Sequence, residues 1–479
     1  MLMQIFQKQS VRSPGAVAIL AAALAVALCS CMSTPPGTHL NQVDVPEAFS
    51  VNGETKLPNR WWESLDNDSL NRLIEQALYH NFSLKTAWNR VAQARALAKR
   101  AGSGRGPVLD GIAGVSRTVS GAPGIDRTYK TDLSLALQAS YEIDVWGRIE
   151  ASVDAAGYDL QATREELDAA AITLSASVAI AWLQLTEQTR QLELLDAQID
   201  TNRQYLEIIT ERFRSGRAAA TDVLQQRQLV EQRRGEKYLV ESAIQTLRHQ
   251  LAVLTGNAPG SPMEYDIPST LPGLPGMPGV GVPAELIQRR PDIRSAALAV
   301  RAADRRVAAA IADRFPRLTL TASASTSAEE VRNLFDNWLA SLAANAAAPL
   351  IDSGRRRAEV ERTRAVLSQA INGYGQIVLD ALKEVEDAIV REEQQKRYIE
   401  SLKTQLDLSG KSTEQTRGNY IKGAADFTRY LTTLLEHQRL QRAVLQAERN
   451  LLVERVNLYR ALAGGWELPV PDDESEISP

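Results

Sequence analysis

The sequence predicts a mixed α/β protein whose single chain contains two repeats, each with long coiled-coil helices and two short strands. Three observations support this fold class. Long proline-free segments space their apolar residues for helices, short segments alternate apolar with small polar residues, and glycine-containing pairs recur at one fixed offset.

The amino terminus has the pattern of a secretion signal. Lys8 and Arg12 precede an apolar run over residues 16–28, which is too short to remain as a membrane-spanning helix. The run ends in Leu28-Cys29-Ser30-Cys31, which resembles the bacterial lipobox.

The lipobox resemblance implies that Cys31 is acylated and becomes the first residue of the mature chain. Several acyl chains on one residue form a stable membrane anchor. Met32 follows where inner-membrane lipoproteins commonly carry aspartate, which favours the outer membrane. The alternative is that Cys31 is only a small apolar residue of the signal.

Composition narrows the class further. Cys29 and Cys31 are the only cysteines, so internal disulfides are not expected to hold the protein together. The 54 basic and 58 acidic residues nearly balance, which gives no reason to expect nucleic acid as a partner. We expect no apolar stretch of about 20 residues after the signal, so a membrane-spanning part would have to be a closed β-barrel.

A two-fold internal repeat organises the chain. Gly147-Arg148 recurs as Gly354-Arg355, and Gly216 recurs as Gly423 at the same offset. A period this long indicates a duplicated domain. The predicted boundaries are residues 1–30 for the signal peptide, 31–60 for the lipidated linker, 61–258 for the first repeat, 259–283 for a Pro/Gly-rich joint, 284–466 for the second repeat and 467–479 for an acidic tail.

Each repeat supplies two candidate strands. Apolar and small polar residues alternate over residues 133–141 and 318–325, which is the two-residue period of a strand with one apolar face. Partner strands are expected within residues 110–120 and 338–350. Because a membrane barrel needs about eight strands or more, four strands must share a barrel with other chains.

The remaining segments predict long helices. Residues 155–213 contain no proline, and their apolar residues follow steps of three and four as in a coiled coil. A helix of roughly 60 residues is about 90 Å long, which exceeds a compact domain. Similar seams follow within residues 240–254 and 378–406. Taken alone, these seams fit a solvated coiled coil without a channel equally well.

Several motifs together resemble the TolC-like outer membrane factor family, within it the lipoprotein branch that serves resistance-nodulation-division pumps. The resemblance spans residues 61–466. It is carried by Trp61-Trp62 with Leu65, Leu70 and Leu73, by Tyr141-Glu142-Ile143-Asp144-Val145-Trp146-Gly147-Arg148, by Arg289-Arg290-Pro291-Asp292-Ile293, by Asp352-Ser353-Gly354-Arg355-Arg356-Arg357, and by Glu384-Val385-Glu386-Asp387-Ala388.

The family resemblance implies a homotrimer with a shared 12-stranded β-barrel that continues into a periplasmic barrel of 12 helices. It implies the exit duct of a tripartite efflux system in the outer membrane, which passes small molecules from an inner-membrane pump and its periplasmic adaptor to the exterior. The expected partners are therefore two further copies, the adaptor, the pump and outer-membrane lipid.

Residues 212–224 and residues 419–431 each lie where a long helix must reverse its direction. A glycine in each segment relieves the turn. By resemblance these turns are the periplasmic tips, where the duct closes and the adaptor docks. The candidate gate residues are Asp222, Arg217, Tyr420, Asp426 and Arg429. The candidate docking residues are Arg212, Phe213, Gly216, Leu224, Gly423 and Leu431. Arg429 stands where many members have a gate aspartate, so the usual carboxylate ring is in doubt.

An enzyme is the rival class. The chain has no His-Glu-x-x-His zinc motif, no Gly-x-Ser-x-Gly elbow and no Walker loop, and its four histidines are scattered. We therefore expect no catalysis, no metal and no cofactor. The same residues are also compatible with a lipid-anchored periplasmic scaffold without a channel, and with a duct for type I protein secretion.

Overall fold

The computed structural model describes residues 43–51, 53, 60–262, 268 and 270–462. The predicted signal peptide, Cys31 and the acidic tail lie outside the described residues. The first repeat contains η1 (Trp61–Leu65), α2 (Asp68–His80), α3 (Phe82–Gly102), η2 (Ser103–Arg105), β1 (Val108–Ala122), β2 (Ile125–Ile143), α4 (Arg148–Arg214) and α5 (Ala220–Leu254). The second contains α6 (Pro283–Arg289), α7 (Pro291–Ala312), β3 (Arg317–Ala328), η3 (Val331–Asn333), β4 (Trp338–Ala347), α8 (Arg355–Ile421) and α9 (Phe427–Leu462).

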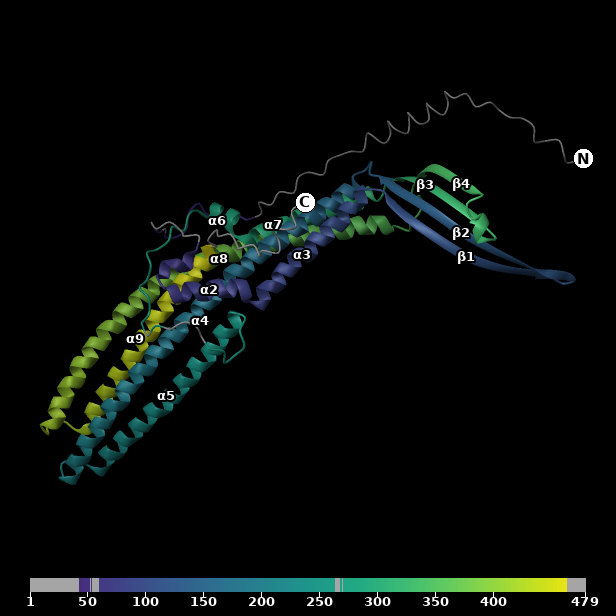
Figure 1. The fold of residues 1–479 in the computed structure, drawn as a ribbon. Helices are drawn as coiled ribbons and strands as arrows, with labels where there is room; N and C mark the ends of the chain where they lie inside the picture. The colour runs from purple at the N-terminus through teal and green to yellow at the C-terminus, as the bar shows by residue number, and fades with distance from the viewer. Residues whose placement is uncertain (1–42, 52, 54–59, 263–267, 269, 463–479) are drawn as a thin grey trace, which may run out of the picture. The chain divides into compact units, whose positions relative to one another are not determined.

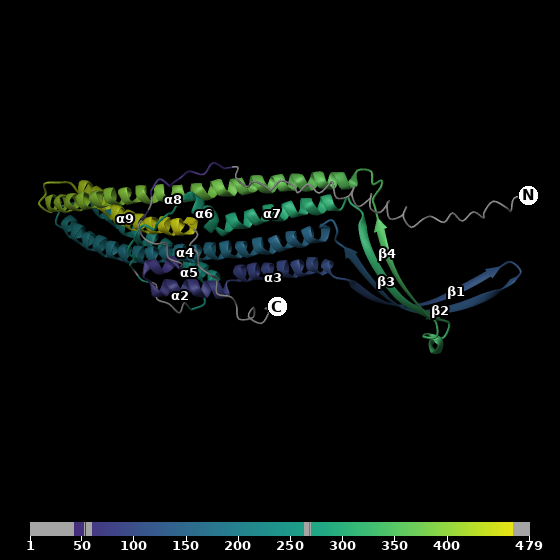
Figure 2. The same ribbon diagram turned by 90° about the horizontal axis from the view of Figure 1, so that it is seen from above.

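The two long helices confirm the helix prediction. α4 and α8 have 67 residues each, so each is about 100 Å long at 1.5 Å per residue. Each begins directly after a strand and ends in a tight turn, from which α5 or α9 returns antiparallel (Figures 1 and 2). The sheet and the two helical turns therefore lie at opposite ends of the long helices.

The four strands form one antiparallel sheet in the order β1-β2-β3-β4. All four predicted strands are confirmed, although the last one ends at Ala347 rather than at residue 350. The sequence Gly102-Ser103-Gly104-Arg105-Gly106 links α3 to β1 through η2.

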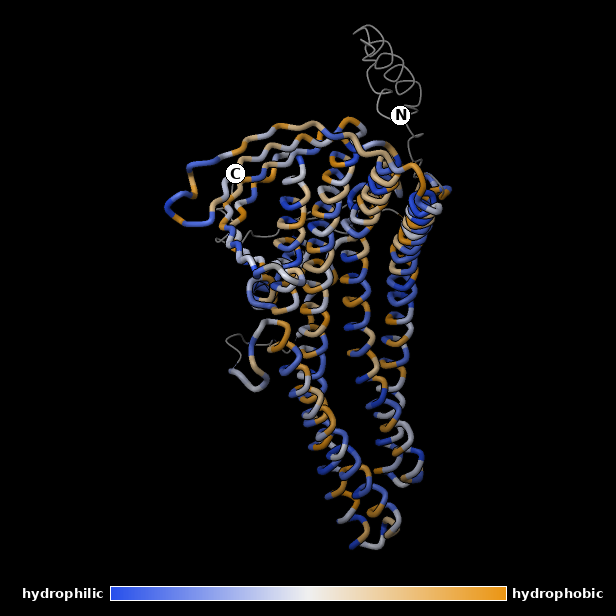
Figure 3. Tube along the Cα trace, turned by 90° about the vertical axis from the view of Figure 1, so that its right-hand side faces the viewer, coloured by the Kyte–Doolittle hydropathy of each residue, from blue (hydrophilic) through white to orange (hydrophobic). Residues whose placement is uncertain are grey.

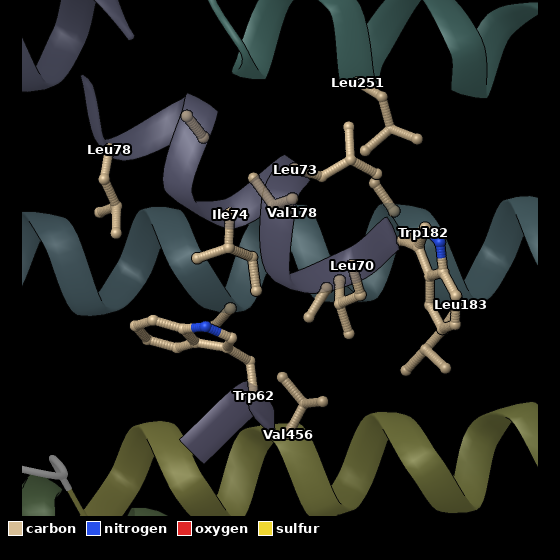
Figure 4. Close-up of a cluster of buried hydrophobic side chains, with 14 of the residues drawn as sticks. Trp62, Leu70, Leu73, Ile74, Leu78, Val178, Trp182, Leu183, Leu251 and Val456 are labelled. Atoms are coloured by element: carbon tan, nitrogen blue, oxygen red, sulfur yellow. The ribbon is translucent and has the colours of Figure 1, made fainter. Parts of the chain in front are cut away.

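The largest apolar cluster lies where α2 crosses the long helices. Trp62 of η1 and Leu70 and Ile74 of α2 meet Trp182 of α4 and Val456 of α9 (Figure 4). Each of these side chains is at most 1% exposed. Burial of a side chain of this size contributes roughly 1.5–3 kcal/mol, so this cluster joins helices of both repeats. The Trp61-Trp62 and leucine part of the family motif is therefore a packing motif.

A buried ion pair also joins α8 to α9. Arg455 and Glu392 are 1% and 2% exposed, and Arg455 Nη2 lies 2.7 Å from Glu392 Oε1. Arg455 also donates to the carbonyl of Gly276 at 2.7 Å and to that of Pro275, so the predicted joint is tied to the helices. Lys396 Nζ approaches the same carboxylate at 2.8 Å.

The expectation that no apolar stretch follows the signal was wrong. α4 contains an 18-residue window that is long and apolar enough to cross a membrane, by length and composition alone. However, 61% of that window is buried within the protein, and Ala171, Val178 and Trp182 belong to the large apolar cluster. Figure 3 shows hydrophobic and hydrophilic residues interspersed along the long helices. The stretch therefore serves packing between helices.

Candidate channel wall and helical tips

The sheet has two chemically different faces. The register places Gly111, Leu137, Ala324 and Ala340 in one row across all four strands. The same face carries Leu109, Ala113, Val115, Leu133, Leu135, Leu318, Leu320 and Leu342. No helix that the structure describes covers this face, and Val115 and Leu342 are 74% and 80% exposed in the single chain. An apolar face this open needs lipid or another apolar partner.

The opposite face is lined mainly by small polar side chains, and one row adds the apolar Ile112 and Leu339. Asp110, Gln138, Ser323 and Ser341 form one row across the sheet. The hydroxyls of Ser323 and Ser341 lie 2.8 Å apart, and neighbouring rows add Ser134, Ser140, Thr319, Thr321, Ser325 and Asn345. This face is wettable and carries little charge, which suits a passage for water and small solutes.

The edges of the sheet are unpaired in the described part of the chain. β1 and β4 each hydrogen-bond to one neighbouring strand only, and every residue in both is exposed. Unpaired edges present rows of backbone donors and acceptors, which are costly in lipid and ready to pair with another chain.

The motifs that carry the family resemblance build the junctions between strands and long helices. Gly147 and Gly354 precede α4 and α8 with φ values of 71° and 85°, which a side chain with a Cβ adopts at a cost. Asp144 accepts from the Glu150 amide at 2.8 Å, and Arg148 pairs with Glu142 at 2.8 Å. These contacts fix the direction of α4 relative to the sheet.

The two helical tips lie at the ends of the long helices away from the sheet. Gly216 follows α4 with φ 69° and Gly423 follows α8 with φ 75°, so the predicted glycine turns are confirmed. The tip turns are hereafter residues 215–219 and 422–426. Phe213 and Leu224 flank the first turn and are 45% and 63% exposed, whereas Leu431 is half-buried against an apolar cluster inside the tips.

Two of the candidate gate carboxylates cap helices in the single chain. Asp222 accepts from the Ala219 amide at 3.2 Å at the start of α5, and Asp426 accepts from the Arg429 amide at 2.7 Å at the start of α9. A side-chain oxygen at this position satisfies a backbone donor that the helix leaves open. The side chains of Arg217 and Arg429 are exposed.

Arg212 joins the two tips, a contact that sequence analysis did not predict. Its guanidinium lies 4.7 Å from the ring centre of Tyr420, and its Nη1 donates to the carbonyl of Ile421 at 3.1 Å. The ring of Tyr420 is 7% exposed, and its hydroxyl has no hydrogen-bond partner in the described protein. Burial raises the pKa of Tyr420, Arg212 opposes this shift, and the nearby charge of Asp222 adds to it.

An aromatic cluster supports this contact. Tyr420 is stacked with Tyr430 at 6.2 Å between ring centres, and Tyr205 meets Tyr430 edge to face at 5.2 Å. Phe427 and Ile209 complete a core that contains residues from α4, α5, α8 and α9. Sequence analysis identified Tyr420 but missed Tyr205 and Tyr430. Tyr205, Tyr420 and Tyr430 lie on three different helices, so the spacing of residues along one helix could not predict that they meet.

A polar belt, buried except for the partly exposed Arg442, lies on the same helices, between the tip cluster and the large apolar cluster. We define it as Gln198, Asn202, Gln226, Arg233, Gln438 and Arg442. Gln198 donates to Gln441 at 2.9 Å and accepts from Arg442 at 2.7 Å. Asn202 and Arg233 both approach the side-chain oxygen of Gln438, at 3.4 and 3.2 Å. The belt links α4 and α5 of the first repeat to α9 of the second.

No metal-binding arrangement occurs within the described ranges, where no three His, Cys, Asp or Glu side chains gather. His437 instead contacts Ser409 at 3.0 Å and Gln441 at 3.3 Å. Burial lowers its pKa, which favours the neutral ring.

Comparisons with known proteins agree on one family. The family model described as outer membrane efflux protein matches residues 73–257 and 282–464. The pyoverdine export outer membrane protein OpmQ of Pseudomonas aeruginosa is 32% identical over 85% of this chain and 88% of its own length. The cation efflux system protein CusC of Escherichia coli is 26% identical over 93% and 98%. The solved outer-membrane channel OprN superposes with a TM-score of 0.83 at 26% identity, covering 90% of this chain and 99% of that one.

Proposed function

The chain belongs to the outer membrane efflux protein family and is an outer-membrane exit duct for efflux, and we propose that three copies build this duct by sharing one β-barrel. Its relatives are efflux channel proteins rather than enzymes. The proposal includes the trimer, the gate, the lipid anchor and the contacts with partner proteins.

The observation that carries the proposal is the four-stranded sheet with two unpaired edges and two unlike faces. Four strands cannot close a barrel alone. Two copies would give eight strands, whose interior is just wide enough for side chains to fill. Three copies give 12 strands and leave an open passage, with the hydroxyl face toward the lumen and the apolar face toward lipid.

The helices offer a matching seam. α5 exposes Tyr238 and Leu239 at 67% and 73%, and α8 exposes Tyr398 and Leu408 at 51% and 60%. α5 and α8 are the outer helices of the four, since α4 packs on α5 and α9 whereas α8 packs on α9 and α7. We propose that α5 of one copy packs on α8 of the next, which extends the barrel into the periplasm.

The tips supply the gate and the docking surface in this proposal. Asp222, with Arg217, Asp426 and Arg429, holds the resting duct shut through contacts between neighbouring tips, and Tyr420 helps from within its own chain. The adaptor binds around Arg212, Phe213, Gly216, Leu224, Gly423 and Leu431 and favours the open tips, since a ligand shifts an equilibrium only through differential affinity. The exposed side chains of Phe213 and Leu224 support a docking role.

The domain boundaries and the anchor complete the proposal. Residues 1–30 are removed, Cys31 carries the acyl chains, and residues 61–258 and 284–466 form the two repeats. Cys31→Ala is expected to leave the barrel assembled but poorly targeted. Mass spectrometry of the mature amino terminus tests this, and an unmodified Cys31 or cleavage elsewhere would contradict it.

The cargo is not set by the fold. Named relatives export pyoverdine, toluene or cations through channels of one family. A wall of small hydroxyls is suited to such unspecific passage, so selectivity is expected in the pump. Neighbouring genes for a pump and an adaptor would identify the system.

Extraction of the outer membrane in mild detergent tests the shared barrel. The expected result is a heat-modifiable species with three times the mass of the mature chain, which cross-linking converts to covalent trimers and which conducts ions in planar bilayers. A folded, membrane-inserted monomer would contradict the proposal. Assembled trimers that never conduct would favour the periplasmic scaffold, and dependence of protein secretion on the chain would favour a type I duct.

A further inference from the structure

The β1–β2 hairpin extends past the rest of the sheet. β3 pairs with β2 only as far as Ala328 opposite Leu133, whereas β1 and β2 continue as a pair from Ser116 opposite Asp132 to Ala122 opposite Ile125. Residues 116–132 are hereafter the projecting hairpin. It is at the end of the sheet away from the long helices (Figures 1 and 2).

The two faces of the projecting hairpin carry different charges. Arg117 opposite Thr131 and Val119 opposite Tyr129 continue the apolar face of the sheet. Arg127 lies on the same face, because a Cβ placed on Gly121 would be 3.2 Å from Arg127 Cγ. The carboxylate of Asp132 alternates onto the other face together with Lys130, whereas the register shift between Ser120 and Ala122 adds a residue to β2 at Asp126, which alternation therefore assigns to neither face. The outward face carries two guanidinium groups, and Asp132 lies on the other face.

These groups are open to a ligand. The guanidinium of Arg117 lies over the ring of Tyr129 at 5.4 Å, which holds it flat against the hairpin. Tyr129 is 60% exposed, and both arginines are exposed. Neither arginine forms an ion pair with any residue that the structure describes.

An aromatic boundary separates this basic face from the apolar band. Phe335 and Trp338 are each 76% exposed and lie beside Leu135 and Leu137 on the apolar face. Aromatic rings of this kind mark the interface of a membrane with water. Trp338 shares a row with Ala113, so Arg117 lies four residues farther along β1, about 13 Å beyond the ring's level.

We propose that the outward face of the projecting hairpin binds the phosphate groups of the phosphorylated glycolipid in the outer leaflet. This inference rests on the proposed barrel, in which the apolar face meets hydrocarbon and the hairpin emerges on the outer side. Guanidinium groups bind phosphate in a bidentate manner, and two of them stand directly beyond the apolar band. The lipid then contacts the barrel with both its chains and its head group.

The test is a native mass spectrometry titration of the full-length detergent-solubilised trimer. The probes are bisphosphorylated lipid A, the same lipid without phosphates, and inorganic phosphate as a competitor. The variants are Arg117→Gln, Arg127→Gln and their combination. Lys130→Gln is the matched control, because it removes one cation from the opposite face of the same hairpin.

Each arginine variant is expected to weaken binding of bisphosphorylated lipid A about fivefold, and the combination about 25-fold. Lys130→Gln should bind like the wild type, and the lipid without phosphates should bind weakly to all proteins. Equal binding by the double variant and the wild type overturns the inference. So does an equal loss in Lys130→Gln, or complete displacement of the lipid by millimolar inorganic phosphate, which would mark a site for free phosphate.

Trimer mass and conductance are measured on the same samples. Failure of the wild type to form a conducting trimer would overturn the proposed function. An intact, conducting trimer whose affinity for bisphosphorylated lipid A is unchanged by the substitutions at Arg117 and Arg127 would overturn this inference alone.

Discussion

Arg212→Ala tests whether the two tips of one chain must separate when the duct opens. In the structure, Arg212 of the α4 end stacks on Tyr420 and donates to the carbonyl of Ile421, both at the α8 end. If opening splays the tips, the loss of this contact should favour the open state.

The magnitude follows from the two interactions. A guanidinium over an aromatic ring contributes about 0.5–2 kcal/mol, depending on its exposure. A charged hydrogen bond contributes about 1.5–3 kcal/mol when well shielded and less here, because Arg212 is only half-buried. A loss of about 2 kcal/mol in one copy shifts the closed-to-open equilibrium about 30-fold, since 1.4 kcal/mol is tenfold.

The assay is single-channel recording of the purified protein in planar bilayers. Arg214→Ala is the control, because Arg214 lies on the same turn, is 69% exposed and pairs only locally with Glu211. Arg212→Ala removes the contact from all three copies and should raise the open fraction by at least about 30-fold, and Arg214→Ala should leave it near the wild type. Tyr420→Phe should also behave like the wild type, because it keeps the ring and removes a hydroxyl that has no hydrogen-bond partner among the described residues.

Equal open fractions in Arg212→Ala and Arg214→Ala would refute this reasoning. A large effect of Tyr420→Phe would also contradict the proposed role of the Tyr420 ring within its own chain. It would show that the hydroxyl contacts another copy.

Three further predictions concern charge. Asp222→Ala removes both a charge and a helix cap, whereas Asp222→Asn removes the charge but keeps an oxygen that can accept from the Ala219 amide. If the gate is ionic, both variants should raise the conductance. A higher conductance in Asp222→Ala alone would show that the residue acts by capping the helix. Arg455→Met leaves the buried Glu392 with Lys396 as its remaining cation, so it should lower the free energy of unfolding by less than the about 3–5 kcal/mol of a fully broken buried pair, and the double change to methionine should cost much less than the two single changes together. Burial and the charge of Glu165 raise the pKa of Asp168 to about 6, with Arg294 partly opposing. Asp168→Asn should therefore raise the unfolding temperature at pH 8. This gain should shrink as the pH falls from 6 toward 4.

The sign of the last prediction follows from linkage. The folded-state pKa of Asp168 lies above its ordinary value of 3.8, so the folded protein binds more protons than the unfolded one between about pH 4 and 6. Stability from this group therefore rises as the pH falls through that window. Glu392 has the opposite sign. Burial would raise its pKa, but Arg455 and Lys396 outweigh burial and lower it, so its contribution is lost only as the pH falls below about 4.5.

Much of the fold was predictable because it depends on local periodicity. The alternation around Leu135 predicted β2, and the steps of three and four around Trp182 predicted α4. Gly216 and Gly423 marked the tips because a tight turn needs positive φ. Each of these signals involves residues that are near one another in the sequence.

The contacts that were missed join distant parts of the chain. Arg212 meets Tyr420 across two separate hairpins, and Asn202 meets Gln438 across both repeats. Residues such as Asn202 look like surface positions of a coiled coil by type, and only the crossing of three helices makes Asn202 fully buried. The apolar stretch in α4 was overlooked for another reason. It contains many alanines, which are apolar but small.

The polar belt explains how such long helices keep their alignment. An apolar coiled-coil seam alone permits a slip by one heptad, because each Leu or Ile finds an equivalent hole. Gln438 bonds with both Asn202 and Arg233, so a slip would leave several buried polar groups without partners. Buried polar groups of this kind are known to specify register at a cost in stability. Because the belt fixes the register above the tips, separation of the tips in the proposed duct would have to break the aromatic cluster and the Arg212 contact below the belt.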